Sequence, residues 1–275
     1  MPTKSPNEEP KLMQAIGIDW ATEPRKRAAV VVEATQAGEI TVLDVTRESL
    51  KDLGVCRLVD SAAASVIAVD IPFGWPSSFR SFVSKWQPGD VHCSESVPSS
   101  DTFRYRATDL RIRRELGKHP LSVSADRIAL GTRKWLELVQ GNPHWLRRID
   151  TGDKVPDGPG APLIEVYPAA SILAFGDSIE GYKSDPEVRE DLVRRLVGRF
   201  KVSFGECSRE EGVRRIASEG RDSDKTDAFV AALSGLVYLG LLPSWVIERP
   251  QGESAIAARA EGWIFYPVPK PKSGD

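Results

Sequence analysis

The chain has 275 residues, 41% of them hydrophobic, so it can bury a substantial core as one large domain or two modest ones, and disorder is not expected. A formal net charge of −2 at pH 7 argues against binding of nucleic acid through a global positive field, so such a partner would need a local basic patch or metal ions. No run approaches the roughly 18 consecutive apolar residues of a membrane helix. Three widely separated cysteines and no apolar leader indicate a reduced, cytoplasmic protein.

The first part of the chain predicts a sheet. Residues 1–11 are polar with three prolines and are expected to form a disordered tail ahead of a single domain over 12–270. Three short apolar, β-branched runs then follow in close succession, which predicts an antiparallel meander; they lie at 14–20, 27–34 and 39–46. Helical spacing over 49–64, followed by a buried strand over 65–74, predicts a parallel crossover and hence a mixed sheet.

The middle of the chain differs in composition and predicts a helical insertion at about 76–160, with arginine-rich segments and proline-bearing loops. Strand character returns at 161–170. An amphipathic helix is predicted over 186–200 and a more apolar one over 224–239, and residues 261–268 could form a closing strand or an extended edge segment. The expected fold class is therefore α/β, with a five-stranded mixed sheet, helices on both faces and a helical insertion between the fourth and fifth strands.

Five carboxylates stand at informative positions on these elements. Asp19 and Asp70 each end a buried apolar run, Glu165 interrupts a third, and Asp224 and Asp227 open the apolar helix. Because functional groups are presented at strand ends, we expect these side chains to converge on one edge of the sheet. Carboxylates that converge repel one another unless a cation lies among them.

Each carboxylate also has a structural interpretation. Asp224 alone is typical of a helix cap or first turn. Asp19 and Asp70 could form strand-end turns, and Glu165 could pair with an arginine. Asp227 is harder to explain in this way, since small packing residues surround it in the sequence.

A cluster of oxygen ligands suits Mg²⁺ or Mn²⁺ better than zinc. Asp224 and Asp227 are three residues apart and share a helix face, so both can point at one ion or at two neighbouring ions. Two ions roughly 4 Å apart can activate a water and stabilise a leaving oxygen, which is the two-metal route to phosphodiester hydrolysis. The pair His92-Cys93 has no second pair of soft ligands at a zinc-like spacing, which argues against a structural zinc site.

The chain contains, in this order, the segments IGIDWA, VIAVDIPFGWP, RATD, IEVYPAA, DKTDAFVAAL and EGWIFYP. Over about residues 16–267 they resemble the motif series of domain-of-unknown-function family 429, whose members are described as predicted nucleases of the ribonuclease H-like superfamily in its RuvC-like branch. The resemblance implies that Asp19 is the first-strand metal ligand, that Asp70 takes the place of the second acid, and that Asp224 and Asp227 form the helix pair. The second acid is often glutamate, and the family commonly has histidine where this chain has Ser223.

Arg106 and Asp109, in RATD, also match this pattern. They belong to the densest basic stretch of the chain, together with Arg104, Arg111, Arg113 and Arg114. Arginine contacts phosphate in a bidentate manner, so this stretch is the candidate for binding the substrate backbone, and Arg127 is a further candidate. The alternative is a solvated helix face with one Arg–Asp pair. Trp20 and Trp75 lie beside the acidic strand ends and could stack on a base or wall the site.

The hypothesis is a hydrolase, a metal-dependent nuclease acting on DNA or RNA with Mg²⁺ or Mn²⁺. One alternative is a phosphotransferase of the sugar-kinase and actin type, for which DWATEPRKRA is a poor match to the first glycine- and threonine-rich phosphate turn. The other is a non-catalytic binding module that retains the fold. ATP-dependent phosphorylation would favour the first alternative, and a stability that no divalent ion changes would favour the second.

Overall fold

The structure is a computed structural model that describes residues 12–46, 49–87, 96–152, 159–205, 207–217 and 223–271. The expected tail at 1–11 and the His92-Cys93 pair lie outside these residues.

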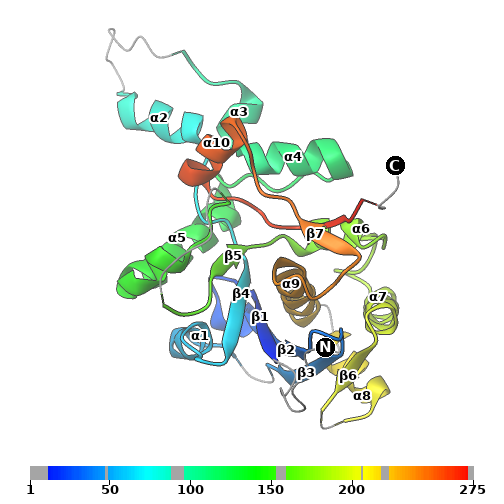
Figure 1. The fold of residues 1–275 in the computed structure, drawn as a ribbon. Helices are drawn as coiled ribbons and strands as arrows, with labels where there is room; N and C mark the ends of the chain where they lie inside the picture. The colour runs from blue at the N-terminus through cyan, green and yellow to red at the C-terminus, as the bar shows by residue number, and fades with distance from the viewer. Residues whose placement is uncertain are drawn as a thin grey trace, which may run out of the picture.

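A mixed sheet forms the centre of the molecule (Figure 1). Its strands are β1 (Met13–Asp19), β2 (Ala28–Ala34), β3 (Ile40–Val45), β4 (Ala64–Asp70), β5 (Leu163–Glu165) and β6 (Val202–Phe204). Their order across the sheet is β5-β4-β1-β2-β3-β6. The first three strands form the predicted antiparallel meander, whereas β4, β5 and β6 each join their neighbour in parallel.

The sheet has six strands, so the expectation of five is wrong. The sixth, β6, pairs with the first three residues of β3 over Ile40–Val42. It is only three residues long and lies directly after a helix, so it lacks the run of alternating residues by which a strand is recognised in a sequence.

The helices follow the chain in order. They are α1 (Asp52–Val59), α2 (Ser77–Lys85), α3 (Ser100–Arg104), α4 (Ala107–Leu116), α5 (Asp126–Gly141), α6 (Pro168–Ala174), α7 (Pro186–Arg199), α8 (Arg209–Ala217), α9 (Asp224–Tyr238) and α10 (Glu253–Glu261), with 3₁₀ turns η1 (Pro24–Lys26) and η2 (Pro143–Arg148). Helices α2 to α5 all lie between β4 and β5, and Figure 1 shows α2 and α3 at the end of the molecule far from β6 and α8. None of the helices in the described ranges is long and apolar enough to cross a membrane.

Of residues 261–268, Glu261 ends α10, and the residues after it do not close the central sheet with a full strand. Ile264 makes a single parallel bridge to Glu165. The chain then forms β8 (Pro267–Pro269), which pairs with β7 (Trp245–Ile247) in a separate two-stranded sheet. This path carries the C-terminal segment along the end of β5.

Helices cover both faces of the central sheet, as predicted. Alternate residues of β1 point to opposite faces: Ala15 joins the core formed with α6 to α9, and Ile16 and Ile18 join the core formed with α1 and α5. Helix α9 lies directly against the first of these faces (Figure 1).

Small residues let α9 approach the sheet closely. A Cβ on Gly17 would lie 2.0 Å from the backbone oxygen of Ala228, and a Cβ on Gly235 would lie 3.0 Å from Val66 Cγ1. The backbones of β1 and α9 are therefore in direct contact, which fixes the position of α9 along β1.

Candidate active site at the ends of β1 and β4

Two predicted carboxylates lie side by side at the carboxyl ends of two neighbouring strands. Strands β1 and β4 are parallel neighbours, and Asp19 is the register partner of Asp70. Each is the last residue of its strand and lies two residues beyond a position on the α9 face, at Gly17 and Ala68 respectively. Both side chains therefore point toward α9, and both are partly buried.

The first turn of α9 supplies the other two aspartates. The contact at Gly17 sets Ala228 against β1, and Asp227 directly precedes Ala228. The hydroxyl of Thr226 donates to the backbone oxygen of Ile216 at 3.1 Å, which ties the same turn to α8. These contacts place the carboxylates of α9 next to the ends of the two strands.

Asp227 is 2% exposed and is held by three donors. The Tyr182 hydroxyl donates to its Oδ1 at 2.9 Å, and the Ser223 hydroxyl donates to its Oδ2, also at 2.9 Å. The Lys183 Nζ lies 3.2 Å from the same Oδ2. Ser223 precedes the helix but its side chain makes no capping bond to the helix backbone, so its hydroxyl serves the carboxylate instead. These three donors hold the Asp227 carboxylate in one orientation, and capping does not account for it.

The four aspartates interact strongly. Burial, followed by the charges of Asp227, Asp70 and Asp224, raises the pKa of Asp19 well above its usual range. Burial and the charge of Asp227 raise the pKa of Asp70 to about 8. Desolvation lowers the pKa of Lys183, but the charges of Asp227, Asp70 and Asp19 outweigh it and keep that pKa above its ordinary value. The Lys183 ammonium is therefore charged and compensates part of the negative charge.

The donor set suits a hard divalent cation. It consists of carboxylate oxygens, and within the described residues neither the Asp19 nor the Asp70 carboxylate accepts a hydrogen bond or forms a salt bridge. In this conformation no three acidic, histidine or cysteine side chains of the described ranges are close enough together to form a metal-binding group. The residue types fit an ion, and in this conformation the Lys183 ammonium lies 3.2 Å from the Asp227 carboxylate.

Glu165 lies in a neighbouring buried ion-pair network. Its Oε1 accepts from Arg106 Nη2 at 2.7 Å, and its Oε2 accepts from Arg106 Nη1 and from the Phe73 backbone N–H, each at 2.9 Å. Asp109 accepts from the same guanidinium at 3.0 and 3.1 Å. Burial raises the pKa of Glu165 despite the arginine. This agrees with the structural alternative for Glu165, that of an ion-pair partner.

Arg106 was expected to lie on a phosphate-binding surface, but the structure buries it. Its residue is 1% exposed, and its guanidinium donates to Asp109, to Glu165 and to the backbone oxygen of Glu261. All five N–H donors of an arginine are needed for these contacts. Arg106 therefore organises the end of β5 and has no donor left for a phosphate.

The C-terminal segment anchors the helical insertion to this network. Glu261 is buried, and its two carboxylate oxygens accept from the backbone N–H of Ser77 at 2.7 Å and of Ala107 at 2.8 Å. These are the first residues of α2 and α4, so a single side chain caps both helices. Gly262 follows with a positive φ of 82°, and a Cβ there would lie 2.9 Å from Glu165 Oε2. Only glycine fits this turn.

A cavity of about 260 Å³ opens beside the aspartates. Its acidic end contains Asp19 and Asp70 with Lys183, and the remainder is largely apolar. Trp20 lines the cavity but is buried, donates its indole N–H to the Gly131 oxygen at 3.1 Å, and is covered on one face by Arg27 at 3.8 Å. It forms a wall of the site, and its rings are not free to stack on a base.

The structure does not bring every predicted residue to the cavity. Trp75 is partly buried and Arg127 is exposed, and neither lines it. Asp224 is partly buried, and its charge helps to raise the pKa of Asp19.

Sequence reasoning missed Tyr182, Lys183 and Glu261. Gly181, at a φ of 77°, is a turn signal that places the first two in a loop. A loop residue has no periodicity that would show which way it faces, so its contact with Asp227 could not be predicted.

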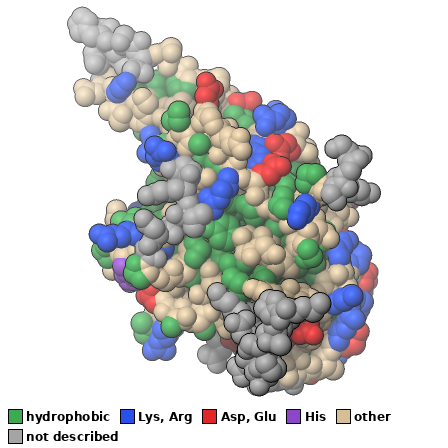
Figure 2. All heavy atoms as spheres, viewed as in Figure 1, with side chains coloured by type: hydrophobic (Ala, Val, Ile, Leu, Met, Phe, Trp, Pro, Cys, Tyr) green, Lys and Arg blue, Asp and Glu red, His purple; other side chains and the backbone are tan. Residues whose placement is uncertain are grey.

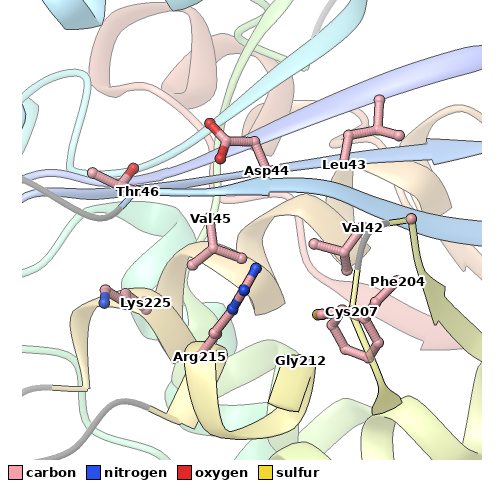
Figure 3. A pocket seen from close by; sticks show the side chains of 11 residues that line it. Val42, Leu43, Asp44, Val45, Thr46, Phe204, Cys207, Gly212, Arg215 and Lys225 are labelled. Atoms are coloured by element: carbon pink, nitrogen blue, oxygen red, sulfur yellow. The ribbon is translucent and has the colours of Figure 1, made fainter.

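A second cavity, of about 210 Å³, lies between β3, β6, α8 and the start of α9 (Figure 3). Arg215 extends toward Val45, and Lys225 lines the cavity from the start of α9. It contains none of the predicted site residues. On the face that Figure 2 shows, basic side chains are interspersed with acidic ones and do not gather into one patch, as the near-neutral net charge suggests.

Comparisons with known proteins give a family match and a distant structural likeness. The family described as "Protein of unknown function (DUF429)" matches residues 17–248. No curated protein matches the chain. The crystal structure of the yeast mitochondrial Holliday junction resolvase Ydc2 is similar at 9% sequence identity and a TM-score of 0.41, over 80% of this chain and 78% of the resolvase chain. At this identity and score the likeness does not bear on activity.

Proposed function

We propose that the chain, which belongs to the DUF429 family of proteins of unknown function, is a nuclease that hydrolyses phosphodiester bonds of DNA or RNA with a divalent metal ion. The proposal includes a ribonuclease H-like fold, for which the β1-β2-β3 meander followed by parallel β4 and β5 is the support. The main support for the proposed activity is that Asp19 and Asp70 lie close to the aspartates in the first turn of α9.

Without a cation, bringing these carboxylates together lowers the stability of the folded protein. Asp19 and Asp70 are held together as register partners, and their raised pKa values express the repulsion and the desolvation. Asparagine would satisfy a purely structural role at either strand end without that cost. Clusters of carboxylates with perturbed pKa values lying in a cavity are typical of functional sites.

Asp19, Asp70 and Asp224 would hold Mg²⁺ or Mn²⁺, with Asp227 as the fourth ligand. When bound, such an ion supplies Lewis acidity to the phosphodiester and to the attacking water. Tyr182 and Ser223 orient Asp227 through their hydroxyl groups.

Lys183 completes the arrangement as a cation of the chain itself. Its side chain is 59% exposed while its ammonium contacts Asp227, so it can also donate to a non-bridging phosphate oxygen of a bound substrate. In the proposed reaction Lys183 orients the phosphate, and the Arg106 network keeps the end of β5 rigid behind it.

The test is cleavage of labelled DNA and RNA oligonucleotides by the purified protein with Mn²⁺. The variants Asp19→Asn and Asp227→Asn are expected to abolish Mn²⁺-supported cleavage, because each removes a charged ligand while preserving side-chain volume. The thermal unfolding midpoint of Asp19→Asn should be similar to or higher than that of the wild type, since burial and the neighbouring aspartates disfavour its charged form. Asp227→Asn loses its ion pair with Lys183, so its midpoint should be lower. Asp44→Asn, at an exposed position on β3, is the matched control and should cleave normally. Cleavage that persists in both site variants would refute the proposal.

Metal binding can be measured without substrate. Mn²⁺ added to the EDTA-treated protein should raise the midpoint, because an ion that binds only the folded state stabilises it by mass action. The double variant Asp19→Asn/Asp70→Asn should show no such rise. An unchanged midpoint in the wild type would instead favour a non-catalytic binding module.

A further inference from the structure

The cavity beside the aspartates has an apolar part that the hydrolysis of a phosphodiester does not itself require. Ile71 and Pro72 line it where the chain leaves β4, and Val123 lines it from the segment before α5. Leu121 and Ile128 add to the same wall, and Leu121 is 67% exposed at the rim. A cavity with a largely apolar lining and a few polar groups at one end is typical of a small-ligand site.

We infer that this apolar part receives one unstacked nucleobase of the substrate, so that the enzyme acts on nucleic acid at an unpaired nucleotide. This inference rests on the proposed function, since it takes the phosphodiester to lie at Asp19 and Asp70. The same cavity contains those carboxylates and the apolar wall, so a nucleotide whose phosphate is at the acidic end has its base beside Ile71 and Ile128.

The size of the cavity limits the ligand. A volume of about 260 Å³ lies just below the range of small-molecule sites, roughly 300 to 1,000 Å³. The space suits a single nucleoside-sized group and excludes a base pair. A base within a regular duplex is stacked and paired, so it can enter such a cavity only after extrusion, which costs a few kcal/mol.

The wall is also poor in groups that could distinguish one base from another. Away from the acidic end its polar residues are Arg106, Asp109 and Glu165, which are bonded to one another, and Tyr167, which offers a single hydroxyl. Recognition of a base edge needs hydrogen-bond donors and acceptors placed against it. The structure therefore assigns this cavity to a base of any identity, and the unpaired state of the nucleotide is what is selected.

The main experiment compares three substrates of one sequence: a single strand, a perfect duplex, and a duplex with one unpaired nucleotide. With Mn²⁺, cleavage next to the unpaired nucleotide should exceed cleavage of the perfect duplex by about tenfold or more, because extrusion from the duplex is avoided. Exchanging the unpaired base should change the rate little. Equal rates on the perfect and the interrupted duplex would overturn the inference.

Variants locate the effect in the cavity. Ile128→Trp fills it and should lower cleavage at the unpaired nucleotide by about tenfold, whereas Leu130→Trp, at a 57% exposed position of the same helix outside the cavity lining, should not. Leu121→Asp changes an exposed residue, so its fold should persist while cleavage falls. If Ile128→Trp and Leu121→Asp both cleave like Leu130→Trp, the cavity does not receive the base.

A second readout does not depend on cleavage. The Asp19→Asn variant is mixed with Mg²⁺ and an oligonucleotide that carries 2-aminopurine at the unpaired position, whose fluorescence is quenched by stacking. Insertion into the aliphatic wall should raise the fluorescence, and the added Ile128→Trp change should remove the rise. If the wild type cleaves none of the three substrates, the proposed function fails; a fluorescence rise then supports only the insertion of an unpaired base into the cavity, and an unchanged signal overturns the inference.

Discussion

Replacing Arg106 tests whether this residue is a buried arginine that holds the structure together or a ligand of the substrate phosphate. The guanidinium of Arg106 makes five hydrogen bonds, to both oxygens of Asp109, to both oxygens of Glu165 and to the Glu261 backbone oxygen. Arg106→Lys keeps the positive charge but loses the planar fork that reaches two carboxylates at once. Arg106→Met removes the charge and leaves two buried carboxylates facing each other.

The contacts of Arg106 determine which variants should lose the most free energy of unfolding. Removing one partner of a buried ion pair costs about 3–5 kcal/mol, so Arg106→Met should lower the free energy of unfolding by about 4 kcal/mol or more. Arg106→Lys loses at least two charge-assisted bonds and should cost about 2–4 kcal/mol. Glu165→Gln should cost less, about 1–2 kcal/mol, because the Arg106–Asp109 pair that remains is neutral overall.

Urea unfolding followed by circular dichroism at 25 °C, in EDTA, measures these free energies. Arg113→Lys on α4 is the control, since the Arg113 side chain is 39% exposed and contacts only Asp101 among the side-chain bonds described. It should change the free energy of unfolding by less than about 0.5 kcal/mol. The reasoning is refuted if Arg106→Lys unfolds like the wild type and only weakens nucleic-acid binding, which is the behaviour of a surface phosphate ligand.

Three further outcomes are expected. Glu261→Ala removes the shared cap of α2 and α4 and should lower the free energy of unfolding by about 1–3 kcal/mol in the same urea assay; no loss would mean that water replaces the cap. Gly17→Ala places a methyl group 2.0 Å from the Ala228 oxygen, so it should cost about 3 kcal/mol and abolish cleavage by displacing α9, and an active, stable variant would contradict the close packing. Because the pKa of Asp70 is raised from 3.8 to about 8, the folded state binds the extra proton between these values and stability in EDTA should fall as the pH rises through this window. Asp70→Asn should flatten that fall in thermal unfolding between pH 5 and 8, and parallel curves for the two proteins would contradict the shift.

The sequence determined those features that depend on local patterns. Buried runs ending in Asp19 and Asp70 were recognisable because a strand alternates or continues its apolar residues over a short window. The apolar helix with Asp224 and Asp227 in its first turn was recognisable for the same reason. The meander, the crossover and the helices on both faces followed from the order of these elements.

Register, burial and long-range partners were decided only by the tertiary structure. Nothing in the sequence states that Asp19 and Asp70 pair exactly across neighbouring strands, because register is set by the packing of both faces and by α9 above Gly17. An arginine near a helix start has the same local pattern whether it meets solvent or a buried glutamate, so Arg106 could be assigned only from its contacts.

The same limit applies to the cation that compensates the site. Lys183 lies in a loop, 44 residues before Asp227 in the numbering of the chain, and its ammonium comes within 3.2 Å of that carboxylate only after α7 and α9 have packed on the sheet. Hydrophobic periodicity encodes which side of an element is buried. It does not encode which charged loop residue meets that element, and this is why the aspartates could be found from the sequence and their lysine could not.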